Sequence, residues 1–337
     1  IYPLEKNRSE YKGYIIQWLQ SGLTRKEDYE QRLSWIPAKA IRYERSFSQD
    51  RGSVSLKDLR IAVVVCNARV GETRQNLEKI ITVVEKARKA AADKICFPEL
   101  SITGYSKHAD LQGIAEPIPG AVSETLSNLA VSNGLLILAG MAEKADHGRI
   151  YATHMIAMPD GELGAYRKIH IAPPEKEIYS PGNSIPTFTF KDATFGIQLC
   201  YDTHFPELST KMALKGAEIL FLPHASPRGM AIDKHRSWMR HLTARAFDNS
   251  VFVVACNQTG YNGKGLTFPG NAVVLDPAGN IIGQSLSSRE TIIFVDLKTE
   301  TFDTIRSNRM HFFLPNRRPE LYNEGSKGSR IRGSEGG

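Results

Sequence analysis

Residues 194–208 read Thr-Phe-Gly-Ile-Gln-Leu-Cys-Tyr-Asp-Thr-His-Phe-Pro-Glu-Leu. The run 195–199 is apolar and β-prone, and apolar side chains recur at helical spacing from Leu208 to Leu214. Cys200 lies on the bend between these two patterns. We therefore predict a buried strand, a turn that carries a cysteine, and a short helix.

The position of Cys200 allows two interpretations. A cysteine on such a bend is held away from ladder hydrogen bonds and faces backbone N–H groups at a helix start. We expect those groups to lower the pKa of the thiol and to be able to hold an oxyanion. The alternative is a buried cysteine that acts as a small hydrophobe, which is the commoner role of a free cysteine. The stretch alone leaves both interpretations open.

Strands and helices alternate on both sides of this stretch. The elements predicted before it are strand 61–66, helix 73–92, strand 94–97, helix 124–132, strand 135–139, and a hairpin of strands 151–158 and 162–167. The elements predicted from it onward are strand 195–199, helix 206–215, strand 218–222, helix 231–248, and strands 251–256, 271–275, 281–284 and 291–296. This order predicts one α/β domain whose helices cover the sheets.

The two ends of the chain differ from this middle part. Residues 1–57 carry one-sided apolar patterns at 9–20 and 24–36, followed by polar residues. They predict a helical N-terminal extension and a linker. Residues 323–337 are rich in Gly, Ser and basic side chains, so we expect a flexible basic tail. A single domain is then expected over 58–322.

Composition limits the possible classes of function. The chain has 337 residues, 41% of them hydrophobic and 23% charged, with a net charge of +7, as expected of a globular protein. Its apolar runs are too short to cross a bilayer, no signal-peptide pattern is evident, and no basic stripe with interleaved aromatics predicts nucleic-acid binding. The cysteines have no paired spacing, which argues against a zinc site or a disulfide framework and favours a cytoplasmic location. They are Cys66, Cys96, Cys200 and Cys256.

Three polar residues have positions that suit a cysteine nucleophile. Glu99 and Lys168 each end a predicted strand, and Glu175 follows in a proline-rich loop. A thiol needs a nearby base, which a carboxylate provides, and a lysine ammonium stabilises negative charge on a carbonyl oxygen. However, no spacing rule links positions 99, 168 and 200, and a Glu or Lys at a strand end is usually solvated.

Three segments stand out in chain order. They are Pro98-Glu99 with Gly104-Tyr105, then Arg167-Lys168-Ile169-His170, then Cys200-Tyr201-Asp202 with Phe205-Pro206-Glu207. Together they resemble the motifs of the nitrilase (carbon–nitrogen hydrolase) superfamily. The likeness covers roughly residues 59–322 and leaves the N-terminal extension outside. It implies a four-layer αββα sandwich and a homodimer or higher oligomer that pairs through the helices near the nucleophile.

The resemblance also implies roles for individual residues. Cys200 would be the nucleophile that forms a thioester, and Glu99 the general base. Lys168 would stabilise the oxyanion, with the backbone N–H of Tyr201 as second donor. A second glutamate of the family matches Glu175.

Two details of this assignment stay open. Glu177 is the near alternative to Glu175, because a two-residue slip in a short loop is easily made. His170 matches a frequent family residue, and a hydrogen-bonded structural histidine is the favoured interpretation.

The substrate is predicted from the residues after the cysteine. Tyr201-Asp202 resembles the amidase and carbamoylase branches, whereas true nitrilases carry Trp-Glu there. We therefore expect hydrolysis of a small-molecule carboxamide or N-carbamoyl (ureido) group, with release of ammonia. Nitrile hydrolysis and a non-hydrolytic binding or assembly role are the alternatives. No metal or organic cofactor is implied.

The residues that follow the cysteine differ from those of the related branches. Branches that act on ω-amides or carbamoyl acids often carry an arginine just after the cysteine, which binds a carboxylate. Here Thr203-His204 stands there, and Arg228 could supply that charge or point to solvent. The residues expected to line the pocket are Tyr105, Tyr201, His204, His224, Ala225 and Arg228.

Overall fold

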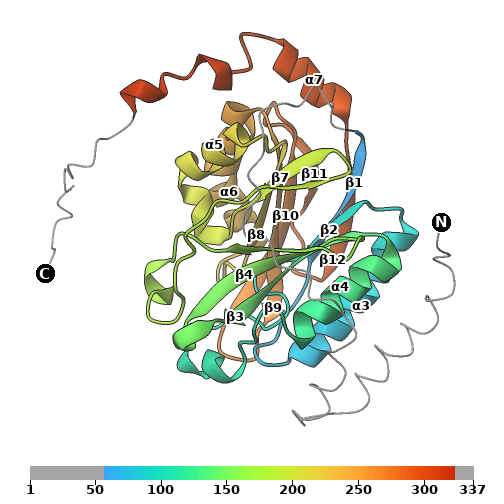
Figure 1. Ribbon diagram of the computed structural model, residues 1–337, viewed down its shortest axis with the longest axis vertical. Coiled ribbons are helices and arrows are strands. Elements are labelled where there is room, and N and C mark those ends of the chain that lie inside the picture. The colour runs from blue at the N-terminus through green and yellow to red at the C-terminus, as the bar shows by residue number, and fades with distance from the viewer. Residues whose placement is uncertain (1–56, 323–337) are drawn as a thin grey trace, which may run out of the picture.

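Two six-stranded sheets face each other in the computed structural model, which describes residues 57–322 (Figure 1). Sheet A consists, in spatial order, of β12 (Thr291–Leu297), β1 (Leu59–Val65), β2 (Lys94–Cys96), β3 (Leu136–Lys144), β4 (Ile150–Ala157) and β5 (Leu163–Arg167). Sheet B consists of β11 (Ile281–Ser285), β10 (Thr267–Leu275), β9 (Phe252–Tyr261), β8 (Ile219–His224), β7 (Ala193–Ile197) and β6 (Phe188–Phe190).

The two sheets share one connection pattern. Three parallel strands lie inside each sheet, β1, β2 and β3 in sheet A and β7, β8 and β9 in sheet B. The remaining strands pair antiparallel on either side of them. Parallel strands covered on both faces need near-continuous apolar sequence, which explains the fully buried run Ile219 to Leu222. Residues that follow these parallel strands come out along one edge of each sheet.

Helices cover the outer faces and complete the four layers. Helices α3 (Thr73–Lys89) and α4 (Ala121–Asn133) pack on sheet A, and α5 (Pro206–Leu214) and α6 (Ala231–Asn249) pack on sheet B (Figure 1). On α3, Leu77, Ile80 and Val84 are buried at three- and four-residue spacing, so one stripe of the helix faces the sheet. The αββα sandwich expected from the sequence is confirmed.

A continuous apolar core fills the space between the sheets. It joins side chains of both sheets, such as Val63 of β1 and Ile197 of β7. Cys96 of β2 and Cys256 of β9 meet across this space with their sulfurs 3.9 Å apart. All four cysteines are free.

Some elements were not predicted from the sequence. Strand β6 has only three residues, too few for a pattern of alternation. Helix α7 (Thr299–Ser307) buries one side chain, Phe302, and is too short to show a long apolar repeat in the sequence. The short 3-10 helices are η2 (Ala109–Gly113), η3 (Asp146–Gly148), η4 (Pro173–Glu175), η5 (Cys200–His204), η6 (Leu314–Asn316) and η7 (Pro319–Leu321). The predicted N-terminal extension, apart from Lys57, and the predicted tail 323–337 lie outside the described residues.

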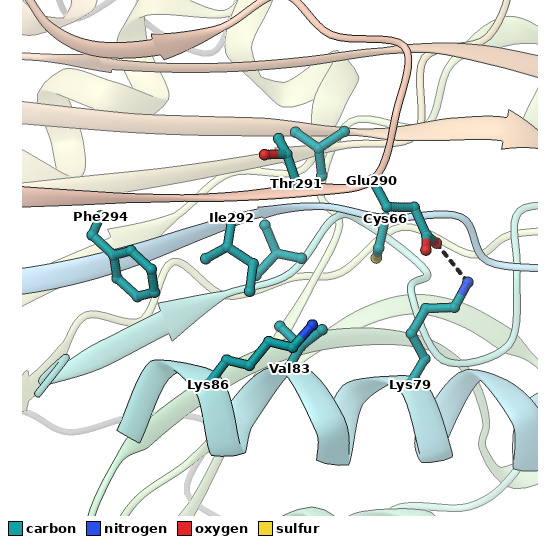
Figure 2. A pocket seen from close by; sticks show the side chains of 10 residues that line it. Cys66, Lys79, Val83, Lys86, Glu290, Thr291, Ile292 and Phe294 are labelled. Carbon is teal, nitrogen blue, oxygen red and sulfur yellow. Dashed lines mark hydrogen bonds and ion pairs between the residues drawn. The ribbon is translucent and has the colours of Figure 1, made fainter. Parts of the chain in front are cut away.

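An apolar groove runs along the outer face of sheet A, between α3 and the edge strand β12 (Figure 2). Val83 of α3 lies opposite Ile292 of β12, and one end of the groove is closed by an ion pair of 2.6 Å between Lys79 and Glu290. The groove contains none of the predicted site residues. Between residues 57 and 322, no helix combines the length and hydropathy required to cross a membrane.

Candidate active site

The predicted site residues follow strands of both sheets. Glu99 comes three residues after the end of β2, and Lys168 directly after β5. Cys200 opens η5, three residues after the end of β7, and Glu175 closes η4. Because β2 and β5 belong to sheet A and β7 to sheet B, the site depends on the packing of the two sheets.

Two glutamates share one lysine at the centre of the site. Lys168 Nζ donates to Glu99 Oε1 at 2.9 Å and to Glu175 Oε2 at 2.9 Å. All three side chains are buried, with Lys168 and Glu99 each 1% exposed. Buried charges of this kind are tolerated only when paired and hydrogen-bonded. The arrangement therefore holds the lysine ammonium in one place between two carboxylates.

The structure distinguishes the two candidates for the second glutamate. Glu175 is buried and contacts Lys168, whereas Glu177 is exposed. Tyr105 donates its hydroxyl to Glu175 Oε1 at 2.9 Å, and burial together with Glu175 raises the pKa of that hydroxyl well above its ordinary value. Tyr105 therefore stays a neutral donor that fixes the second carboxylate oxygen.

Glu99 is fixed from the opposite sheet as well. The backbone N–H of Ala225, which follows β8, donates to Glu99 Oε2 at 2.9 Å. The side-chain amide of Gln258, on β9, donates to the backbone carbonyl of Glu99 at 2.8 Å. Gly140 allows the close approach from sheet A, because a Cβ there would lie 2.5 Å from the backbone nitrogen of Leu100. The carboxylate is therefore held by both sheets.

Cys200 lies in a tight turn that is anchored by Asp202. The cysteine has φ +43°, a left-handed conformation that is costly for a residue with a side chain and is typical of functional sites. Asp202 is fully buried and accepts hydrogen bonds from the backbone N–H of Leu199 (2.9 Å) and of His170 (2.8 Å). It also accepts one from the hydroxyl of Tyr166 at 2.8 Å. Asp202 therefore ties the cysteine turn to the chain on both sides of Lys168.

The predicted effect on the Cys200 pKa is wrong. Burial and the nearby Glu99 raise the pKa of the thiol, and the opposing charge of Lys168 is not sufficient to lower it. Helix-start N–H groups were expected to lower it, but the strand-end turn buries the thiol among carboxylates instead. The resting thiol is therefore protonated and needs a base.

The pKa values of Glu99 and Lys168 are shifted in directions that suit the activation of a protonated thiol. Burial raises the pKa of Glu99 to about 7, and Lys168 only partly opposes this. Burial disfavours the ammonium of Lys168, but Glu99 and Glu175 outweigh it and hold its pKa well above the ordinary value. The lysine therefore stays charged at neutral pH, and the carboxyl of Glu99 can exchange a proton near neutral pH.

The other residues expected to line the pocket have different environments. His204 and Arg228 are exposed, and Tyr201 is partly exposed, with its ring 5.7 Å from that of His204. His224 is 2% exposed, bonded through Nδ1 to the carbonyl of Leu222 at 2.7 Å, and its ring lies 4.3 Å from that of Trp238. His224 therefore supports the loop after β8.

His170 has the structural contacts that its favoured interpretation requires. Its Nδ1 lies 2.8 Å from Asp202 Oδ1, and its ring stacks on Phe205 with centroids 3.7 Å apart. These contacts hold the segment after Lys168 against the cysteine turn.

Sequence reasoning assigned no supporting role to three residues next to the site. Gln258 supports Glu99, and Asp202 supports the cysteine turn. Burial lowers the pKa of Lys234 on α6, and the nearby Cys200 opposes this shift. Gln258 lies in the polar run Asn257-Gln258-Thr259, two residues beyond the predicted strand 251–256, so no sequence pattern pointed to it. No signal in the sequence pointed to Lys234, since it lies on a helix of mostly polar residues.

Comparison with known proteins identifies the family. The model of the carbon–nitrogen hydrolase family matches residues 60–307. An (R)-stereoselective amidase of Pseudomonas sp is 30% identical over 226 residues, which are 66% of this chain and 80% of the amidase. A nitrilase of Pyrococcus abyssi is 29% identical over 274 residues (78% and 99%), and an omega-amidase of Mus musculus is 29% identical over 264 residues (75% and 92%).

Solved structures agree with this result. A mutant amidase from Nesterenkonia AN1, of the nitrilase superfamily, has a TM-score of 0.69 at 25% identity and covers 80% of this chain and 98% of its own. A CN-hydrolase superfamily protein from Xanthomonas campestris has a TM-score of 0.71 at 21% identity, covering 78% and 98%, and supports the fold alone. Because the family match spans most of the chain and the fold agrees with it, this chain belongs to the carbon–nitrogen hydrolase family and is a carbon–nitrogen hydrolase.

Proposed function

We propose that this enzyme hydrolyses the C–N bond of a small-molecule carboxamide or N-carbamoyl (ureido) compound through a thioester on Cys200, and releases ammonia. The observation that supports it most is Glu99, whose carboxylate binds Lys168 on one oxygen and the N–H of Ala225 on the other. A base and an oxyanion donor are thus held together beside a protonated thiol.

In the first half-reaction, Glu99 takes the proton of the Cys200 thiol, and the sulfur forms a bond to the amide carbon. Negative charge grows on the amide oxygen, where Lys168 and the backbone N–H of Tyr201 donate hydrogen bonds. Glu99 then gives its proton to the nitrogen, the C–N bond breaks, and ammonia leaves. An acyl thioester remains on Cys200.

In the second half-reaction, Glu99 takes a proton from water, and the hydroxide oxygen bonds to the thioester carbon. The C–S bond breaks, the carboxylic acid leaves, and the sulfur regains a proton. Glu175 keeps Lys168 in position throughout, because it binds the same ammonium at 2.9 Å. The overall reaction consumes one water molecule for each amide that is hydrolysed.

The relatives support a cysteine-dependent reaction on an amide. One mutant of the Nesterenkonia amidase, 26% identical to this chain, carries the product of Michael addition of acrylamide at its active-site cysteine. Tyr201-Asp202 after the cysteine favours an amide over a nitrile here. A relative that bears the name nitrilase keeps nitrile hydrolysis as the second candidate.

The test measures ammonia release from butyramide, succinamate, N-carbamoyl-β-alanine and butyronitrile, together with the intact mass of acid-quenched protein. We expect an amide or ureide to release ammonia and to leave an acyl adduct on the wild-type chain. Cys200→Ala should reduce the rate by at least about 10³-fold. Cys66→Ala, at a buried cysteine outside the site, is the control and should retain turnover. Ammonia from the nitrile alone, or from none of the compounds, contradicts the proposal.

We also propose that the chain forms a homodimer through α5 and α6 and works in the cytoplasm. Two apolar side chains on these helices, Leu214 and Phe247, are 51% and 39% exposed, as expected of a face that a partner covers. The free cysteines favour a reducing compartment. Light scattering coupled to size-exclusion chromatography tests whether the chain forms a dimer, and a monomeric mass would contradict the proposed homodimer.

A further inference from the structure

The outer face of strand β12 is apolar, although β12 lies at the edge of sheet A. Side chains alternate across a strand, so Ile292 and Phe294 point away from the core between the sheets, in which Val295 and Leu297 are buried. Phe294 is 42% exposed. Exposed edges usually carry charged side chains, and an apolar edge is typical of a surface that another segment covers.

Helix α3 forms the opposite wall of the groove that runs along this face. Lys79, Val83 and Lys86 line the groove, at positions i, i+4 and i+7 of the helix. Figure 2 shows their side chains on the side of α3 that faces Ile292 and Phe294. The groove has a volume of about 370 Å³, and ligand sites typically measure about 300–1,000 Å³. The groove therefore has room for several apolar side chains.

Ion pairs mark the two ends of the apolar floor of the groove. Lys79 pairs with Glu290 at 2.6 Å just before β12 begins, and Arg60 pairs with Asp296 at 2.8 Å near the end of β12. Glu290 and Asp296 are six residues apart in the sequence, which is about 20 Å along an extended strand. An occupant of the groove therefore needs an apolar stripe that is no longer than about 20 Å.

The chain that precedes the described residues enters beside this groove. Strand β1 begins at Leu59, and Ala62, three residues farther along, lies opposite Phe294. The entry point is therefore about 10 Å from the groove along the strand. The twenty residues 37–56 connect it to the apolar pattern at 24–36, and a chain of this length can extend to about 65 Å. A segment joined in this way meets the groove at a high effective concentration.

The pattern at 24–36 fits the groove in spacing and in length. Tyr29, Leu33 and Ile36 recur at i, i+4 and i+7, which is also the spacing of the three residues of α3 that line the groove. Residues with this spacing share one stripe of an α-helix. A helix of the thirteen residues 24–36 would be about 20 Å long. Its stripe therefore matches the apolar floor between the two ion pairs.

The charges beside this stripe also fit the walls of the groove. Glu30 and Arg32 flank Leu33 on opposite sides, because each residue turns a helix by about 100°. The groove carries Lys79 and Lys86 on its α3 wall, and Glu290 at its β12 wall. A helix that directs Glu30 towards α3 directs Arg32 towards β12, so both flanks meet opposite charges.

We propose that residues 24–36 form a helix that places Tyr29, Leu33 and Ile36 in the groove between α3 and β12. The N-terminal extension then covers the edge of sheet A that lies beside α3. The other apolar pattern, at 9–20, lies farther from β1 along the chain and is not the occupant. This inference does not depend on the proposed function, because the groove contains none of the site residues.

Crosslinking of the full chain tests the contact directly. On a Cys200→Ala background, Leu33→Cys and Phe294→Cys are introduced together, and the protein is treated with a short bismaleimide. We expect mass spectrometry of the digested monomer to show the two peptides joined within one chain. Cys66, which also lines the groove, should not compete, because burial raises the pKa of its thiol to about 12.

Two matched pairs serve as controls for the crosslink. Val131→Cys replaces Phe294→Cys at another exposed apolar residue, on α4 beside the turn between β4 and β5, and should crosslink at least about tenfold less. Ile15→Cys replaces Leu33→Cys to test the pattern at 9–20. If Ile15→Cys and not Leu33→Cys joins to Phe294→Cys, the assignment is overturned. A crosslink that joins two chains places a second copy in the groove and also overturns it.

Hydrogen exchange provides a readout without crosslinking. The backbone amides of 24–36 should be protected in the full wild-type chain, and Phe294→Asp should reduce this protection by at least about tenfold, whereas Val131→Asp should not. Leu33→Asp leaves the residues of the groove unchanged and should cause the same loss, so the test holds even if Phe294→Asp fails to fold. Amides of 24–36 that exchange as fast as those of an unfolded peptide in the wild type, or protection that survives both substitutions, overturn the inference.

Discussion

Three ionisable residues in this site have pKa values that differ from their ordinary values. The Cys200 thiol has a raised pKa, and the carboxyl of Glu99 has a pKa raised to about 7, in each case first because of burial. Lys168 stays charged because two carboxylates lie 2.9 Å from its Nζ. In the mechanism that we propose, this combination provides a protonated nucleophile, a base that titrates near neutral pH, and a fixed cation for the oxyanion.

The raised pKa of Glu99 predicts the pH dependence of the reaction. The base acts when it is deprotonated, so kcat/KM should rise with pH and level off above about 7. A carboxylate with an ordinary pKa of 4.5 would give a flat profile between pH 6 and 8. Steady-state rates across this range test the point, and a flat profile contradicts it.

Substitution of the base tests its role directly. Glu99→Gln should lower kcat by at least about 10³-fold, because the thiol then has no base. Glu177→Gln, at the exposed glutamate of the neighbouring loop, is the matched control and should keep nearly full activity. Equal activity of the two variants would exclude Glu99 as the base.

At the scale of elements, the short helix η5 begins at Cys200, and Asp202 holds this helix in place. This carboxylate accepts the backbone N–H groups of Leu199 and His170 and the hydroxyl of Tyr166. Leu199 follows β7, whereas Tyr166 and His170 lie just before and just after Lys168. Asp202 therefore keeps two separate segments in register, although it has no part in the proposed chemistry.

Asp202→Asn should weaken this junction, because the amide nitrogen would face groups that are themselves donors. We expect a loss of about 3 kcal/mol in the free energy of unfolding and slower alkylation of Cys200 by iodoacetamide. Tyr166→Phe removes one donor only and should have a smaller effect on both measurements. Asp146→Asn, at an exposed position, is the control. Wild-type stability and alkylation in Asp202→Asn would contradict the role.

The whole molecule is a pair of sheets whose inner faces exclude water, and this burial extends to ionisable groups outside the site. Lys94 of β2 is fully buried, and its Nζ donates to the carbonyl of Phe190 at 3.3 Å. Burial lowers its pKa from 10.5 to about 7. Below pH 10.5 the unfolded chain holds a proton on this lysine, which the folded chain releases above about pH 7.

The stability of the fold should therefore depend on pH through Lys94. The unfavourable free energy of burying a charged Lys94 is largest at and below about pH 7. It decreases as the pH rises towards 10.5, so the free energy of unfolding increases with pH in this window. Lys94→Met should raise the free energy of unfolding by about 1–4 kcal/mol at pH 7 and by much less at pH 10. Lys89→Met, at an exposed lysine of α3, should show no such difference. Urea unfolding at both pH values decides between these outcomes.

The sequence by itself determined the order of the elements and the family. Apolar periodicity depends on neighbours along the chain, so the strand and helix spacing around Cys200 predicts the local structure, and three motifs in order indicate the chemistry. The same local information predicted the hairpin of β4 and β5, which pair antiparallel. It could not predict β6 or α7, because both elements are short and carry few apolar residues.

Only the tertiary structure decided how the site residues meet. The choice of Glu175 over Glu177 as partner of Lys168, the support from Gln258, and the position of Lys234 follow from packing between the two sheets and α6. The direction of the Cys200 pKa shift was also decided there, against the local expectation. The physical reason is that burial and Coulomb interaction depend on distances through space, whereas a sequence pattern records distances along the chain.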